Sequence, residues 1–269
     1  MRYNKSIVER KEMKSMKQAI LSAQNVCKSF AHNGGQLHVL SGVNLDIYEG
    51  DFTVIMGASG SGKSTLLYAI SGMDQATAGR VMYRNRGDLV AMKEKELAKL
   101  RYEDFGFIFQ QMHLVSNLSL EENIAVSGYL DKRKSKEDVA KRVEELLERM
   151  GLTEVKKHLP AQVSGGEQQR CAIARAVVNT PRLLFADEPT GALNRKNTKE
   201  VLNLLSQLNQ EGQSIVMVTH DVRAALRATR IVYIEDGNVI GDLTLPPYKK
   251  EEEKSREAQV NAWLSSLEW

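Results

Sequence analysis

The chain has 269 residues, of which 42% are hydrophobic and 26% are charged, a composition typical of a folded globular protein rather than a disordered or collagen-like one. Its formal net charge of +3 is too small to indicate nucleic-acid binding by itself, and its two cysteines exclude a disulfide framework. No apolar run approaches the roughly 18 residues of a membrane span, and the first residues lack the apolar segment of a signal peptide. We therefore expect a protein that works at a membrane only by docking to a partner.

Residues 1–19 are polar and charged, and we expect them to form a frayed helical extension. The next segment has the pattern of short strands separated by turn-forming residues, at 21–26, 39–40, 43–47 and 52–56. A glycine-rich loop then leads into a predicted helix at 64–71. The order strand, loop, helix is the beginning of an α/β unit.

Helical patterns dominate at about 93–163, and the apolar residues of 135–150 recur at helical spacing. The α/β alternation then returns, with helices at 166–178 and 195–209 and buried-strand patterns at 183–186, 215–219 and 231–234. The sequence thus predicts an α/β core at 20–245 that is interrupted by a helical insertion at about 93–163.

Residues 246–269 are predicted to end in an amphipathic helix that starts near residue 251. One face of this helix carries apolar residues at positions i, i+3, i+4 and i+7, namely Val260, Trp263, Leu264 and Leu267. Lys254, Arg256 and Glu257 belong to its polar surroundings. We expect the apolar face to pack on the chain's own core, and the alternative is a face that binds a partner.

A glycine-rich loop that fits the pattern G-x-x-x-x-G-K-S/T connects the strand at 52–56 to the helix at 64–71. Glycines let the backbone curl so that several N–H groups point at one anion, and the helix start adds its positive end. Lys63 supplies a charge to the β- and γ-phosphates of a nucleotide, and the Ser64 hydroxyl can ligate Mg²⁺. The residues of this predicted cradle are Gly57, Ala58, Ser59, Gly60, Ser61, Gly62, Lys63, Ser64 and Thr65.

Two acids, Asp187 and Glu188, follow the apolar run at 183–186, which places carboxylates at the ligand-binding edge of a parallel sheet. Asp187 is the candidate for holding Mg²⁺ or its water, and Glu188 is the candidate for polarising an attacking water. An acidic pair after a strand is weak evidence alone, but it is strong evidence when a phosphate-binding loop precedes it. His220, at the end of another apolar run, either reaches the γ-phosphate or is an ordinary packed or surface residue.

Ser164, Gly165 and Gly166 stand directly before a predicted helix and form a second candidate anion-binding helix start. One mononucleotide does not need two such cradles. The economical explanation is that this helix start serves a nucleotide held by another subunit, and the alternative is a simple loop and helix cap.

In this order and spacing, the motifs resemble the ATP-binding subunits of ATP-binding-cassette (ABC) transporters, and the match runs from about residue 21 to residue 242. The resemblance implies an α/β fold, a P-loop NTPase (RecA-like) core with an antiparallel β subdomain and an inserted helical subdomain. It also implies ATP and Mg²⁺ as cofactors.

The resemblance implies roles for individual residues as well. Phe30 matches the aromatic residue that stacks on adenine, with an ordinary core phenylalanine as the alternative, and Gln110 matches the glutamine that touches Mg²⁺ and the attacking water. Glu188, His220 and Gln110 would be the catalytic residues, and Ser64, Gln110 and Asp187 the metal-binding ones. The residues that close over the partner subunit's nucleotide would be Ser164, Gly165, Gly166 and Glu167.

Two positions depart from the family pattern, since Val163 stands where leucine is usual and Asn194 where aspartate is usual. The asparagine keeps the size but loses the charge, so hydrolysis should survive while coupling between two sites is in doubt. The sequence around Gly165 resembles the branch of macrolide export, lipoprotein release and bacitracin-type antimicrobial-peptide resistance. A tail with Trp263 and Trp269 leans toward peptide resistance.

The resemblance implies an ATPase that powers export or removal of an antimicrobial peptide, drug or lipid-linked substrate. Two copies would sandwich two MgATP molecules head to tail and drive a separately encoded membrane permease, which grips the groove near 110–118. The chain would sit peripherally on the cytoplasmic face of the cell membrane and bind no nucleic acid. The alternatives are a cell-division ATPase that drives a permease-like regulator, and a soluble DNA-repair or translation ATPase. The substrate and its direction stay open.

Overall fold

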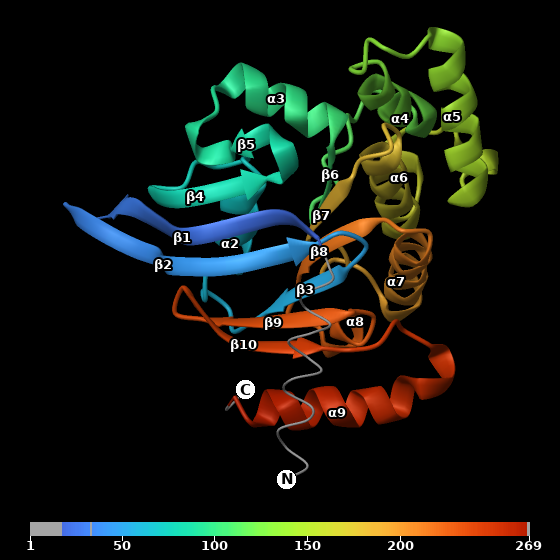
Figure 1. Cartoon of the computed structure of the whole chain (residues 1–269). Helices are drawn as coiled ribbons and strands as arrows, with labels where there is room; N and C mark the ends of the chain where they lie inside the picture. The colour runs from blue at the N-terminus through green and yellow to red at the C-terminus, as the bar shows by residue number, and fades with distance from the viewer. Residues whose placement is uncertain (1–17, 33, 268–269) are drawn as a thin grey trace.

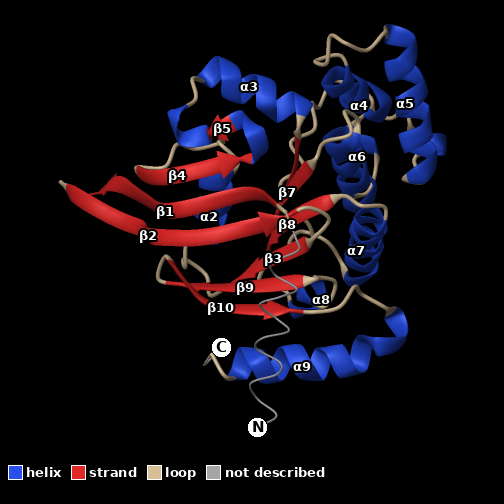
Figure 2. Ribbon diagram, viewed as in Figure 1, coloured by secondary structure: helices blue, strands red, loops and turns tan. Residues whose placement is uncertain are grey.

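The computed structural model describes residues 18–32 and 34–267, which form two β-sheets with helices packed around them (Figure 1, Figure 2). The smaller sheet contains, in spatial order, β2 (Gly35–Tyr48), β1 (Ala19–His32), β4 (Ala78–Tyr83) and β5 (Gly87–Asp88). The larger sheet contains, in spatial order, β10 (Asn238–Thr244), β9 (Arg230–Glu235), β3 (Phe52–Met56), β8 (Ser214–Val218), β7 (Leu183–Asp187) and β6 (Phe105–Phe109).

The helices connect and cover these strands. They are α2 (Lys63–Ile70), α3 (Glu94–Glu103), α4 (Leu120–Gly128), α5 (Lys136–Arg149), α6 (Gly165–Val177), α7 (Arg195–Gln210), α8 (Val222–Ala225) and α9 (Glu253–Ser265). Short 3-10 turns lie at η1 (Arg84–Arg86), η2 (Leu89–Ala91), η3 (Thr153–Val155), η4 (Pro160–Gln162) and η5 (Lys250–Glu252). Among the helices of the described ranges, none is both long enough and apolar enough to cross a membrane.

The two sheets differ in the direction in which their strands pair. The smaller sheet is antiparallel, with β1 paired to β2 and to β4 and β4 paired to β5. In the larger sheet β10 runs antiparallel to β9, whereas β9, β3, β8, β7 and β6 are joined by parallel pairs. Parallel strands are buried on both faces, which is why β3, β7 and β8 are nearly continuous apolar runs in the sequence. The observed architecture has the expected P-loop NTPase arrangement of a parallel core beside an antiparallel sheet.

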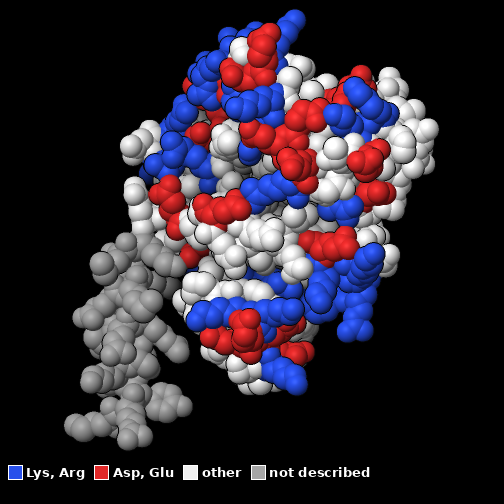
Figure 3. All heavy atoms as spheres, turned by 90° about the vertical axis from the view of Figure 1, so that its right-hand side faces the viewer, with Lys and Arg blue, Asp and Glu red and all other residues white. Residues whose placement is uncertain are grey.

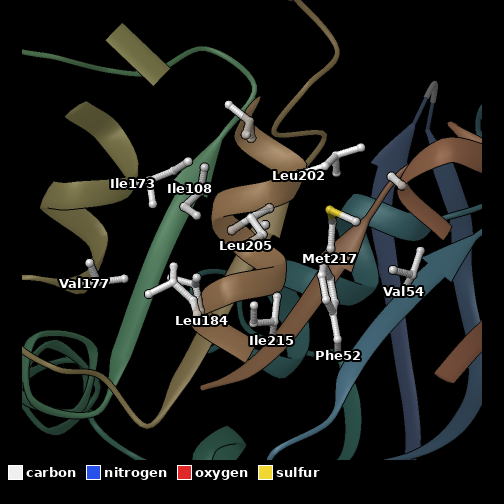
Figure 4. Close-up of a cluster of buried hydrophobic side chains, with 14 of the residues drawn as sticks. Phe52, Val54, Ile108, Ile173, Val177, Leu184, Leu202, Leu205, Ile215 and Met217 are labelled. Carbon is white, nitrogen blue, oxygen red and sulfur yellow. The ribbon is translucent and has the colours of Figure 1, made fainter. Parts of the chain in front are cut away.

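Alternation along the parallel strands separates two hydrophobic cores. On β3, Val54 faces the core that contains α6 and α7, whereas Ile55 faces the core that contains α2 and the antiparallel sheet. Met217 and Val216 of β8 divide in the same way. Figure 4 shows Val54 and Met217 with Leu205 of α7 and Ile173 of α6 in the first of these cores. The helices α2 and α6 therefore lie on opposite faces of the larger sheet.

The antiparallel subdomain is simpler than the predicted pattern of short strands. The two strands predicted at 39–40 and 43–47 are one continuous strand, β2, which forms a long hairpin with β1. A register shift lies between the pairs Val26–Val43 and Lys28–Leu40, and it accommodates the two residues that separated these predicted strands. Residues 1–17 and 268–269, which include most of the predicted extension and Trp269, lie outside the described residues.

The helical insertion predicted at 93–163 starts too early, because the range includes a strand of the core. β6 (Phe105–Phe109) pairs in parallel with β7 at the edge of the larger sheet. The helices α4 and α5 come after β6, and their buried residues pack with those of α6. A five-residue apolar run between two helical patterns has too little periodicity to be recognised as a strand. The other predicted domain boundaries, 20–245 and 246–269, stay predictions.

The helix α9 packs on the chain's own core, as expected for the amphipathic tail. Val260 and Leu264 are buried in the core that includes β9. Trp263 and Leu267 cover Gly241 of β10, where a Cβ atom would lie 2.9 Å from the indole ring and 2.8 Å from the leucine side chain. The prediction for Arg256 was wrong, because this residue is buried and donates hydrogen bonds to the carbonyl groups of Pro246 and Ala228.

Candidate functional site

The glycine-rich loop before α2 is an open cradle of backbone groups. A Cβ atom on Gly57 would lie 2.1 Å from the carbonyl oxygen of Ile234, so only glycine fits where the loop leaves β3. Gly62 is the N-cap of α2 with a φ of 98°, a left-handed conformation that favours glycine, and no described side chain caps this helix. The first backbone N–H groups of α2 therefore remain available to an anion at its positive end.

Lys63 and Ser61 bring hydrogen-bond donors to this cradle. The Lys63 ammonium donates to the carbonyl oxygens of Gly57 at 3.0 Å and Ala58 at 2.7 Å. Burial lowers the pKa of Lys63, and the charges of Glu188 and Asp187 partly offset that effect. The buried Ser61 hydroxyl has no hydrogen-bond partner within residues 18–32 and 34–267. The Lys63 ammonium, the curled backbone of the loop and the unpaired Ser61 hydroxyl together suit the binding of nucleotide phosphates.

Asp187, at the end of β7, is held by two hydroxyl groups from α2. Ser64 Oγ donates to Asp187 Oδ1 at 2.8 Å, and Tyr68 Oη donates to Asp187 Oδ2 at 2.5 Å. A carboxylate and a hydroxyl are the hard oxygen ligands that Mg²⁺ prefers. In the described part of the chain no group of three or more His, Cys, Asp or Glu side chains could hold a metal alone. The remaining ligands of such an ion would come from other oxygen donors, such as phosphates and water.

Glu188 is fixed by the residues that follow β8. Its carboxylate accepts a hydrogen bond from Thr219 Oγ1 at 3.0 Å, and its other oxygen lies 2.8 Å from His220 Nδ1. The backbone of Glu188 has a φ of 45°, which is uncommon for a residue with a side chain. The side chain is 15% exposed, so it can reach a water molecule while its orientation is set. His220 is 68% exposed, so it is a surface residue in contact with the acid rather than a packed one.

Three neighbouring parallel strands deliver these groups to one edge of the sheet. Phe109 of β6 and Val218 of β8 are both in register with Asp187 of β7. Gln110, Glu188 and Thr219 therefore leave adjacent strands at the same level. The Gln110 side chain lies against Gly191, where a Cβ atom would come within 2.9 Å of its amide nitrogen. The structure thus brings Gln110, Asp187, Glu188 and His220 together with the end of the phosphate-binding loop.

Phe30 lies on β1, in the antiparallel sheet, and is 42% exposed, so it is not an ordinary core phenylalanine. The Lys28 ammonium lies 4.9 Å from the centre of its ring. Exposure leaves an aromatic surface that a planar base can stack on.

The helix start at Ser164 is closed, in contrast to that of α2. Ser164 and Glu167 form a capping box in which the Ser164 hydroxyl accepts from the Glu167 N–H, and the Glu167 carboxylate accepts from the Ser164 N–H and hydroxyl. These hydrogen bonds lower the pKa of Glu167. The Asn197 amide packs on Gly166, where a Cβ atom would lie 2.5 Å from it. Since α6 and α2 lie on opposite faces of the sheet, the structure does not bring these residues to the chain's own phosphate-binding loop.

Sequence reasoning missed Tyr68 and Thr219. Tyr68 lies four residues after Ser64 on α2, a spacing that places two side chains on one helix face. Thr219 directly precedes His220 and, like it, follows β8. Both signals were present in the sequence, but only the tertiary structure shows that the Tyr68 hydroxyl meets Asp187 and the Thr219 hydroxyl meets Glu188.

The chain matches the family model described as ABC transporter over residues 40–191. It is 39% identical over 254 residues to the macrolide export ATP-binding/permease protein MacB of Pasteurella multocida, an alignment that covers 94% of this chain and 38% of MacB. It is 44% identical over 228 residues to the protein of the same name from Bradyrhizobium diazoefficiens, over 84% of this chain and 34% of that protein. The chain thus spans little more than a third of the length of these curated relatives.

Two solved structures have a similar fold. One is described as a dimeric structure of a post-hydrolysis state of the ATP-binding cassette MJ0796 bound to ADP and Pi, with a TM-score of 0.78 and 39% identity, covering 85% of this chain and 100% of that one. The other, described as a dimeric structure of MJ0796, a bacterial ABC transporter cassette, has a TM-score of 0.78 and 40% identity over the same shares. The fold, the phosphate-binding loop and the family match agree, and the chain belongs to the ABC transporter family.

Proposed function

We propose that the chain is the ATP-binding and ATP-hydrolysing subunit of a membrane transporter. The observation that carries the proposal is the Glu188 carboxylate, held between Thr219 and His220 beside the Asp187–Ser64 pair. A fixed, accessible carboxylate next to a phosphate cradle is what a general base for water attack requires. In the proposed reaction a water molecule attacks the γ-phosphate, and Glu188 accepts a proton from this water.

Each group of the site has a distinct role in this proposal. The phosphate-binding loop and Lys63 hold the β- and γ-phosphates, and Phe30 stacks on the adenine. Mg²⁺, which neutralises phosphate charge when bound, would be held by Ser64, Gln110 and Asp187. His220 keeps the Glu188 carboxylate oriented from its exposed side.

The chain acts as a head-to-tail dimer in this proposal. Ser164 and Gly166 stand at the start of α6, which packs on the opposite face of the sheet from α2, and this placement supports a role for them across an interface. Both MJ0796 structures are described as dimeric, one with ADP and Pi bound. ATP binding would close the dimer and hydrolysis would open it.

The dimer would drive a separate membrane permease and sit on the cytoplasmic face of the membrane through it. The relatives are named ATP-binding/permease proteins, and this chain spans about a third of their length. The loop after Gln110 is a suitable contact, because Val115 is 46% exposed and Arg175 holds the carbonyl groups of Met112 and His113 at 2.6 Å each. A fixed loop with an exposed apolar side chain can transmit movement to a partner.

The transported substrate would be a drug, an antimicrobial peptide or a lipid-linked molecule, and the relatives' name favours drug export. No nucleic-acid partner is proposed, since the net charge is only +3 and basic and acidic side chains are mixed on the face shown in Figure 3. A regulatory ATPase that drives a permease-like partner without transport is the second candidate. Co-purification of the permease, followed by ATP-dependent uptake assays in vesicles, separates these two.

Replacing the base tests the enzymatic part of the proposal. We expect Glu188→Gln to bind MgATP while its turnover falls by about 10²–10⁴-fold, the typical contribution of general-base assistance. The variant should accumulate as a closed, ATP-bound dimer in size-exclusion chromatography. Steady-state phosphate release close to that of the parent would remove Glu188 from this role.

A further inference from the structure

The carboxylate of Asp187 is held from both sides by one helix. Ser64 and Tyr68 are one helical turn apart on α2, and their hydroxyls donate to different oxygens of Asp187 at 2.8 Å and 2.5 Å. The terminal torsion of an aspartate is otherwise broad, so two donors fix the plane of the carboxylate. The Tyr68 hydroxyl therefore determines which edge of Asp187 faces the phosphate-binding loop.

Tyr68 is suited to positioning rather than to binding. Its ring packs against the core shared by α2 and the antiparallel sheet, so the hydroxyl is presented on a rigid support. It brings no charge to the site, where Lys63 already lies close to two carboxylates. The remaining lone pairs of the Ser64 and Asp187 oxygens stay available to a cation.

We propose that Tyr68 is a positioning residue that orients Asp187 for Mg²⁺, with Asp187 Oδ2 held by the tyrosine and Oδ1 presented beside Ser64. This inference rests on the proposed function, because it requires a metal–nucleotide complex at the phosphate-binding loop. Mg²⁺ demands near-ideal octahedral geometry, so a carboxylate in a fixed plane favours it. Partners that hydrogen-bond to a metal-binding carboxylate typically contribute 10–100-fold to metal affinity.

The test uses Tyr68→Phe, which keeps the ring and its packing but removes the hydroxyl. Mn²⁺, as a paramagnetic probe for the Mg²⁺ site, is titrated into the full-length chain saturated with a non-hydrolysable ATP analogue, and free Mn²⁺ is measured by electron paramagnetic resonance. Affinity for the analogue is measured separately in EDTA. We expect about 10–100-fold weaker Mn²⁺ binding and unchanged metal-free nucleotide affinity.

Tyr248→Phe is the matched control, because Tyr248 also donates to a carboxylate, that of Glu253 at 2.8 Å, next to α9. This variant should keep the Mn²⁺ affinity of the parent. Mn²⁺ binding within twofold of the parent in Tyr68→Phe, or equal weakening of nucleotide binding with and without metal, would overturn the inference and leave the ATPase proposal intact. Absence of metal-dependent nucleotide binding in the parent chain would overturn the proposed function and this inference together.

Discussion

The two glycine-containing helix starts of this chain, at α2 and at α6, differ in backbone geometry and in how their first N–H groups are satisfied, since the N-cap Gly62 is left-handed and the N-cap Ser164 is extended. The start of α2 has a glycine N-cap and a buried lysine, and no described side chain satisfies its first N–H groups. The start of α6 is satisfied internally by the Ser164–Glu167 capping box. An open start needs an anion to complete it, whereas a closed start is stable alone and can give up a hydrogen bond when a partner arrives.

This difference explains why one motif works within its own chain and the other across an interface. Lys63 is buried with its charge directed at the loop, so phosphate has a local counter-charge. Ser164 is exposed and has no such cation in its capping box. We expect the first site to set the affinity of a single subunit and the second to act only in the dimer.

Paired alanine substitutions at Lys63 and Ser164 should separate the roles of the two helix starts most clearly. Lys63→Ala removes a buried cation from the phosphates, and charged hydrogen bonds contribute about 1.5–3 kcal/mol, so ATP affinity should fall by about tenfold to more than a hundredfold. Ser164→Ala should leave the affinity of the isolated subunit unchanged. Fluorescence titration measures the ATP affinity of both variants at a protein concentration too low for the chain to dimerise. Equal losses in the two variants would contradict the assignment of the sites to different subunits.

The closed state of α6 can be tested through stability. Glu167→Ala removes the reciprocal half of the capping box, and loss of a cap typically costs about 0.5–2 kcal/mol in the free energy of unfolding. Glu167→Gln is the control, since glutamine can accept the same hydrogen bond from the Ser164 N–H. Urea unfolding should show the loss only for alanine. If both variants unfold as the parent does, the capping box does not stabilise this helix start.

The smallest expected effect concerns Asn194, which caps α7 by accepting a hydrogen bond from the Asn197 N–H at 2.9 Å. Aspartate caps a helix equally well and adds a charge favourable at a helix N-terminus, so Asn194→Asp should change stability by less than about 1 kcal/mol. If the missing charge weakens coupling, the substitution should raise the ATPase rate or its cooperativity in ATP. A rate and Hill coefficient equal to the parent's would show that this departure is neutral.

Some parts of the site could be predicted from the sequence and others could not. The loop before α2 was predictable because strand, glycines and helix are adjacent in the chain, and their spacing alone determines the cradle. Asp187 and Glu188 were predictable because a buried apolar run ends at them. The contacts Tyr68–Asp187 and Thr219–Glu188 were not, because each joins a residue to a strand far away in the sequence.

The sequence by itself determined the chemistry of this protein: the phosphate-binding loop, the acidic pair and the amphipathic tail are local patterns of residue type and spacing. Only the tertiary structure decided that β6 joins the sheet, that Arg256 is buried, and that α2 and α6 lie on opposite faces. The physical reason is that strand pairing and burial depend on partners distant in the chain, whose packing outweighs the local preference of a five-residue run or a single charged side chain.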